Sequence, residues 1–164
     1  MDYKGYHFEK WMRLFDSRPG HCDPDSDLPE HSLEMMAKFA ETFQDWHNVL
    51  RRTEAGGAIE EIASRQMIGI AENFGQWLKV YQECGDRDGS KEVAMSQLMK
   101  LADNPKDAKW CKRPKDLRQR RWERVFAISP PGSEPESRAK QRIFEIMLED
   151  KAAEIKTPQM TTKI

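Results

Sequence analysis

Residues 35–50, MMAKFAETFQDWHNVL, decide the fold class of this chain. Large apolar side chains recur in this stretch at alternating steps of three and four residues, at Met36, Phe39, Phe43, Trp46 and Leu50. That spacing places them on one side of an α-helix, in the a/d pattern of helices that pack lengthwise. Asp27 and Glu30 stand at the N-cap and capping-box positions before it. We therefore predict a helix from about residue 28 to residue 50.

A second apolar series follows after the short connection Gly56-Gly57. Its members step by four and three residues, at Ala63, Met67, Ile70, Phe74, Trp77, Tyr81 and Cys84. Two long helices with matching apolar seams and a short connection are typical of an antiparallel helical hairpin. The two seams predict such a hairpin as the centre of the fold.

The sequence on both sides of this hairpin also favours helices. Pro19-Gly20 ends a first helix, a shorter helix carries Val93 and Leu101, and residues 114–128 form a basic helix. Ser133 and Glu136 form a capping-box pattern before a last helix. We see no internal repeat and no alternating strand pattern. The prediction is an all-α bundle of five to seven helices, with one domain over residues 1–156 and a disordered tail over residues 157–164.

Composition indicates a folded protein of the cytoplasm. Hydrophobic residues make up 38% and charged residues 34% of the chain, with seven Phe, five Trp and three Tyr. No run approaches the 18 apolar residues of a membrane span, and the first residues lack a signal-peptide pattern, so we expect no membrane partner. Cys22, Cys84 and Cys111 are odd in number and have no ligand spacing, which predicts reduced thiols.

The net charge of −1 conceals a polarised chain. Residues 1–50 carry five Lys and Arg against ten Asp and Glu, a net −5. Residues 101–164 carry fifteen against ten, a net +5. An acidic front and a basic back indicate either charge pairing within the fold or an anionic partner.

The basic charge is concentrated in residues 112–124, which hold seven cations and two anions. Lysine and arginine contact phosphates, and aromatic rings stack on bases. We therefore predict a nucleic-acid-binding helix, with no strong sequence readout, in a non-enzymatic accessory protein. Trp122 would stack on a base or anchor the helix, and four arginines would bind phosphates. The predicted binding residues are Lys112, Arg113, Lys115, Arg118, Arg120, Arg121, Trp122 and Arg124.

Two other functions stay open. A protein–protein adaptor or inhibitor would use the acidic N-terminal third or a helical seam. A calcium binder or metal-dependent enzyme would use helix carboxylates or the acidic connector. In the connector, Asp23, Asp25, Asp27 and Glu34 occupy positions 1, 3, 5 and 12 of a calcium loop. Leu28 takes the position that normally needs Gly, so we interpret the connector as a helix cap with surface charge. No phosphate-binding loop or catalytic motif occurs, and we expect no metal and no cofactor.

Overall fold

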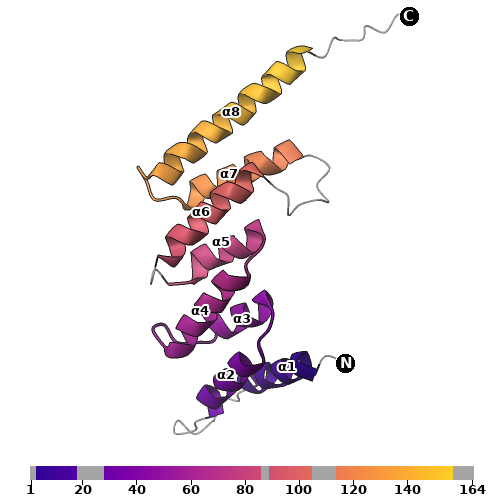
Figure 1. The fold of residues 1–164 in the computed structure, drawn as a ribbon, viewed down its shortest axis with the longest axis vertical. Helices are drawn as coiled ribbons and strands as arrows, with labels where there is room; N and C mark the ends of the chain where they lie inside the picture. The colour runs from indigo at the N-terminus through magenta and orange to yellow at the C-terminus, as the bar shows by residue number, and fades with distance from the viewer. Residues whose placement is uncertain (1–2, 18–27, 86–88, 105–113, 157–164) are drawn as a thin grey trace, which may run out of the picture. The chain divides into compact units, whose positions relative to one another are not determined.

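A computed structural model of the chain describes residues 3–17, 28–85, 89–104 and 114–156. These residues form α-helices and contain no strand (Figure 1). The helices are α1 (Tyr3–Asp16), α2 (Leu28–Phe39), α3 (Phe43–Leu50), α4 (Ala58–Ile70), α5 (Phe74–Glu83), α6 (Ser90–Asp103), α7 (Pro114–Ile128) and α8 (Glu134–Lys156). The all-α prediction is confirmed. The described residues hold eight helices rather than five to seven.

The two long helices of the predicted hairpin are each divided. The first ends at Phe39 and restarts as α3, and the second ends at Ile70 and restarts as α5. The helices that pair as a hairpin at this place are therefore the short α3 and α4. The apolar period continues through both breaks, which is why it did not reveal them.

Side-chain caps cause both breaks. The Thr42 hydroxyl accepts a hydrogen bond from the Asp45 backbone N–H at 3.2 Å, and the Asp45 carboxylate accepts the Thr42 N–H at 2.9 Å. Asn73 and Gln76 exchange the same two hydrogen bonds, at 3.0 and 3.3 Å, before α5. Each reciprocal pair satisfies backbone donors that a continuous helix would have bonded itself. Neither break needs Gly or Pro.

The two capped segments belong to an internal repeat of 31 residues, so the sequence prediction of no repeat was wrong. Residues 40–49, AETFQDWHNV, recur as residues 71–80, AENFGQWLKV. The following helices continue the correspondence, because Ala63 and Met67 of α4 align with Ala94 and Leu98 of α6. The two copies differ at most of their solvent-facing positions, so the spacing of apolar residues alone does not reveal the repeat.

The repeated positions are the core. In both copies the Phe, Trp and Val of the first helix are buried, and so are the two aligned residues of the second helix. Trp46 precedes Ala63 by 17 residues, and Trp77 precedes Ala94 by the same number. Trp122 of α7 and Ala139 of α8 have this separation too. Phe8, Trp11 and Leu14 repeat the first-helix pattern in α1. Within the described residues the sequence pattern thus occurs four times, in α1, α3, α5 and α7, and we group each of these helices with the helix that follows it as a helix pair.

The turns inside the helix pairs are also alike. Gly56, before α4, and Gly132, before α8, both have positive φ, at 94° and 76°. The N–H of Gly56 donates to the Glu60 carboxylate, and the N–H of Gly132 donates to the Glu136 carboxylate at 2.6 Å. Hydrogen bonds from Lys140 and then from Gly132 lower the pKa of Glu136 below its usual value. The same glycine turn and acidic partner therefore begin the second helix of two different pairs.

Gly132→Ala should destabilise the protein by about 1–2 kcal/mol, because an L-residue pays a steric cost in the left-handed region. No atom lies near the site of the added Cβ, so any loss comes from the backbone conformation. Gly69→Ala is the matched control, since Gly69 lies inside α4 with equally open space and no positive φ. That change should stabilise by about 0.5–1 kcal/mol. Urea unfolding of both variants measures the difference, and equal effects would contradict the turn geometry.

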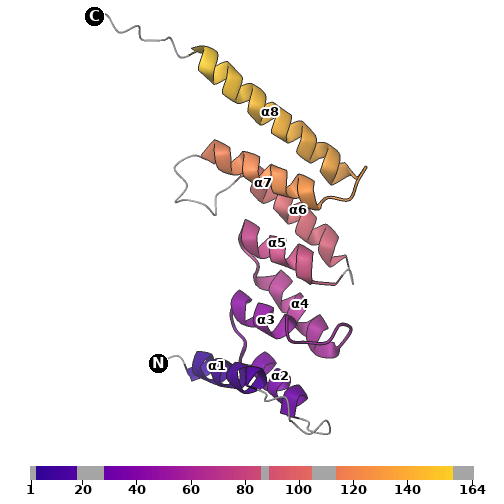
Figure 2. The same cartoon turned by 180° about the vertical axis from the view of Figure 1, so that it is seen from behind.

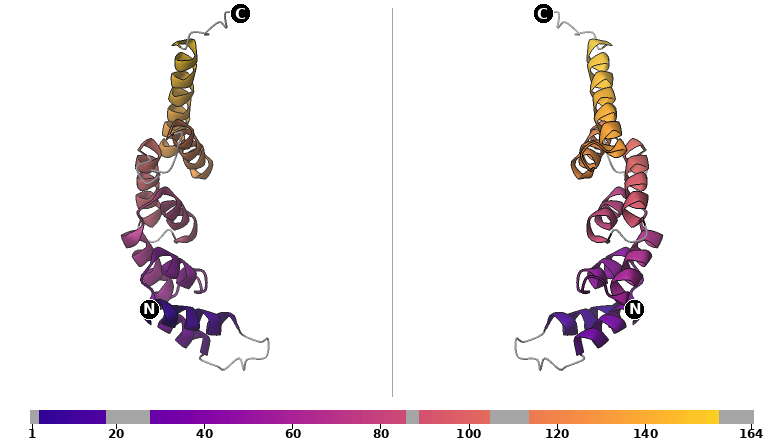
Figure 3. Two further views of the ribbon diagram at one scale, coloured as in Figure 1. Left: turned by 90° about the vertical axis from the view of Figure 1, so that its right-hand side faces the viewer. Right: turned by 90° about the vertical axis from the view of Figure 1, so that its left-hand side faces the viewer.

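Contacts divide the chain into two compact units. The N-terminal unit consists of Met1–Glu72 and Lys79–Lys91, and the C-terminal unit consists of Asn73–Leu78 and Glu92–Ile164. Within the N-terminal unit α1 packs on α2 and α3 on α4, and within the C-terminal unit α7 packs on α8 (Figures 1 and 2). Figure 3 shows the α7–α8 pair from two further sides. The single domain over residues 1–156 stays a prediction, and the tail at 157–164 lies outside the described residues.

Candidate nucleic-acid interface

The basic helix predicted over residues 114–128 is present as α7. α7 begins at Pro114, whose fixed φ and missing N–H suit the first helical position, and ends at Ile128. Lys112 and Arg113 lie outside the described residues, and the side chain of Lys115 is not described either. The remaining predicted residues, Arg118 to Arg124, can therefore be placed, and they divide into an inward and an outward group.

Trp122 belongs to the core of the C-terminal unit. Its side chain is 0% exposed, and its indole N–H donates to the Asp103 carboxylate of α6 at 3.2 Å. A base cannot stack on a ring that the protein covers completely. The base-stacking role predicted for Trp122 therefore does not fit its burial, whereas the anchoring role does.

Arg121 is also part of the fold. The residue is only 8% exposed, its guanidinium lies 4.9 Å from the centre of the Phe74 ring, and it donates to the Leu101 carbonyl oxygen at 2.9 Å. Both contacts join α7 to elements of its own unit. A buried guanidinium that contacts a ring and a carbonyl has little surface left for a phosphate, so the phosphate-binding role predicted for Arg121 does not fit its burial.

Arg118 lies at the edge between the two groups. Its side chain is partly buried, and one terminal nitrogen lies 3.9 Å from the Glu149 carboxylate of α8. Its Nε is buried and has no hydrogen-bond partner within the described chain. Arg118 is thus partly covered by α8 and less exposed than Arg120 and Arg124.

Arg120 and Arg124 form the outward group. Both side chains are exposed, and they stand four residues apart on one face of α7. Across the residues that the structure describes, neither takes part in an ion pair or a hydrogen bond. Glu123 lies beside them but is hydrogen-bonded by Gln119 at 2.9 Å. Among the predicted interface residues whose side chains are described, these two arginines are the ones exposed and unpaired, as contact with an anion requires.

Periodicity did not identify the residues that organise this region, Asp103 and Arg142. The Asp103 carboxylate accepts hydrogen bonds from Trp122 and from two nitrogens of Arg142, at 2.9 and 2.6 Å. Asp103 raises the pKa of Arg142 above its usual value, and Gln141 and then Arg142 lower the pKa of Glu145. The internal repeat would have marked Asp103, because it aligns with Glu72 and Glu41.

The other predicted sites gain no support. Asp23, Asp25 and Asp27 lie outside the described residues, and no group of three potential metal ligands occurs in the described ranges. His47 and Glu83 contact each other at 2.8 Å. Cys84 is a free thiol whose burial raises its pKa, which makes it a poor nucleophile.

No described helix is both long and apolar enough to cross a bilayer. Comparison of the chain with protein-family models, curated proteins and solved structures found no match.

Proposed function

We propose that the protein is a non-enzymatic accessory protein that binds a nucleic-acid backbone through the outer face of α7. Arg120 and Arg124 carry this proposal, because they are exposed, adjacent and without partners in the described part of the chain. Lys112, Arg113 and Lys115 precede them in the sequence and would extend the same contact. Phosphates would be bound by charge and hydrogen bonding alone, so sequence preference would be weak.

Titration with mixed-sequence single-stranded RNA and duplex DNA at several salt concentrations tests this function. Each phosphate contact contributes a slope of about −0.9 on duplex, or about −0.7 on single strands, in log affinity against log salt. The double variant Arg120→Ala/Arg124→Ala should reduce the slope by about one to two units and weaken all sequences similarly.

A control must remove the same charge elsewhere. Arg65 and Arg138 are exposed and each forms an i,i+4 pair with a glutamate of its own helix. Arg65→Ala/Arg138→Ala should leave the slope unchanged if binding is local to α7. An equal loss of slope in both double variants would show that the whole surface, not this face, attracts the nucleic acid. Absence of binding at about micromolar protein and low salt would remove the proposal.

A protein–protein adaptor is the second candidate function. Its support is the outer face of α8, where Phe144 and, one helical turn later, Met147 and Leu148 are exposed large apolar residues. Contiguous exposed apolar side chains mark interaction sites more often than scattered ones do. The adaptor predicted from sequence used the acidic N-terminal third or a helical seam; the α8 face adds a third surface at the opposite end of the chain.

A further inference from the structure

The repeat shows how one helix pair covers the next. In the C-terminal unit the end of α6 is covered by the pair α7–α8: Ala102 is fully buried, and Asp103 contacts Trp122 and Arg142. The Leu101 carbonyl accepts a hydrogen bond from Arg121 at the same place. The last turn of α6 is therefore the surface on which the α7–α8 pair packs.

On α8 the equivalent surface is open. The positions that align with Ala102 and Asp103 are Met147 and Leu148, which are 47% and 49% exposed, and Phe144 one turn earlier is 61% exposed. The described ranges thus leave about half or more of each of these three side chains exposed. Leucine also replaces the acidic residue that the three earlier pairs carry here, at Glu41, Glu72 and Asp103. The face is thus more apolar than its buried counterparts.

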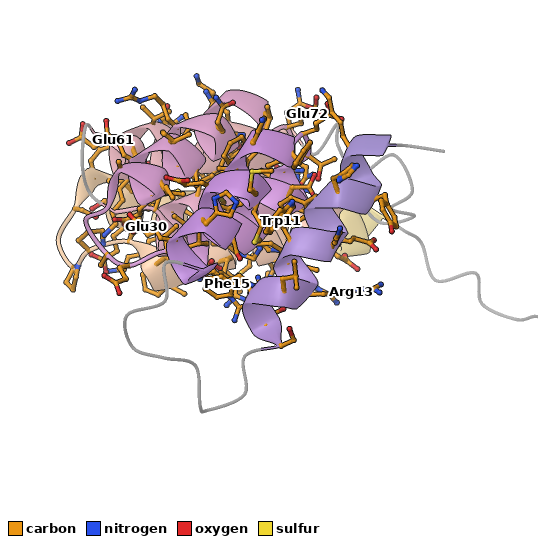
Figure 4. The ribbon with its side chains drawn as sticks, turned by 90° about the horizontal axis from the view of Figure 1, so that it is seen from below. Trp11, Arg13, Phe15, Glu30, Glu61 and Glu72 are labelled. Atoms are coloured by element: carbon orange, nitrogen blue, oxygen red, sulfur yellow. The ribbon has the colours of Figure 1, made fainter. Side chains whose placement is uncertain are left out.

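In the first helix pair, α1–α2, a position that is buried in the later pairs is exposed. Leu14 of α1 aligns with Val49, Val80 and Val125, which are all completely buried, yet Leu14 is 38% exposed. Figure 4 shows Trp11 and Phe15 on the side of α1 toward α2 and Arg13 on its outer side. The outer side bears a shallow hollow of about 450 Å³, lined by Tyr6, Glu9, Lys10, Arg13, Leu14 and Ser17. In later pairs this valine position is closed.

We propose that the open face of α8 in one copy of this chain docks on the outer face of α1 in a second copy. The contact would repeat between copies the packing of the α7–α8 pair on the end of α6 within the C-terminal unit. Charge favours the contact locally, because the hollow on α1 is lined by Lys10 and Arg13 against Glu9, whereas α8 carries six Asp and Glu against five Lys and Arg. It is a heterologous, head-to-tail contact, so each bound copy keeps one free end. The proposal rests on the adaptor alternative and is independent of nucleic-acid binding.

Sedimentation analysis of the full chain over a range of concentrations tests the proposal. The wild-type mass should rise from one chain to two and beyond as concentration increases. Leu14→Glu blocks the head, Phe144→Glu blocks the tail, and each variant alone should remain monomeric. Both positions are exposed, so the changes leave the core intact, which thermal unfolding verifies.

Mixing the two variants gives the decisive result. Leu14→Glu retains an intact α8 face and Phe144→Glu retains an intact α1 face, so their equimolar mixture should form a dimer that stops at two chains. Ile62→Glu, on an exposed position of α4, is the matched control and should self-associate like wild type.

Three results would overturn the inference. The first is a wild-type chain that stays monomeric up to about 1 mM, since any association would then be weaker than roughly 4 kcal/mol. The second is a Leu14→Glu variant that still dimerises, which would indicate a contact between two α8 faces. The third is an equimolar mixture of the two variants that fails to associate. None of them bears on nucleic-acid binding, which the salt titration measures separately.

Discussion

Trp122→Ala should lower the free energy of unfolding by about 3–5 kcal/mol, the range for deleting a large buried aromatic side chain. The ring is fully buried, and its removal leaves a cavity between α7 and the elements that it packs on. It also removes the indole donor to Asp103, although Arg142 still binds that carboxylate. Urea unfolding followed by circular dichroism at 222 nm measures the loss.

Two controls separate the parts of this effect. Trp122→Phe keeps most of the apolar volume and removes the hydrogen bond, so it should cost less, with about 1 kcal/mol from the lost bond. Arg124→Ala changes an exposed residue of the same helix and should stay within about ±0.5 kcal/mol. A Trp122→Ala protein as stable as wild type would place the ring at the surface and restore base stacking as its role.

Burial at Trp122 also changes how binding experiments are interpreted. A loss of nucleic-acid affinity in Trp122→Ala would follow from unfolding of α7, whether or not the ring touches a base. The arginine variants avoid this ambiguity, because Arg120 and Arg124 project outward. They are therefore the informative substitutions for the proposed function.

Apolar periodicity predicted helix positions better than helix ends. The basic helix was predicted from Pro114 to Ile128 and found there, because Pro at its start and Ser-Pro-Pro after its end are unambiguous signals. The divisions before Phe43 and Phe74 were missed, because the a/d pattern continues across them. Thr42 with Asp45 was the available signal, a capping box inside an apolar series.

Site prediction from composition met a different limit. Charge and a nearby tryptophan identified the right helix, but they could not distinguish Arg121 from its neighbour Arg120. That distinction depends on which side of α7 meets Phe74 and Leu101, which lie 47 and 20 positions away in the sequence. Tertiary packing alone fixes this direction. The 31-residue repeat would have supplied it, since Trp122 aligns with the buried Trp46 and Trp77.

Met67→Ala should cost about 2–5 kcal/mol, the range for truncating a fully buried methionine. Met67 is 0% exposed in α4, at the position that Met36 and Leu98 occupy, also fully buried, in the neighbouring pairs. Met147→Ala is the same chemical change on the open face of α8 and should stay within about ±0.5 kcal/mol at low protein concentration. Urea unfolding of both variants measures the contrast.

At concentrations where copies associate head to tail, the Met147 variant should additionally lose stability relative to wild type, because association stabilises the folded chain by mass action. Equal costs at low concentration would show that Met147 is already covered within one chain, and the α8 face would then be closed to a second copy.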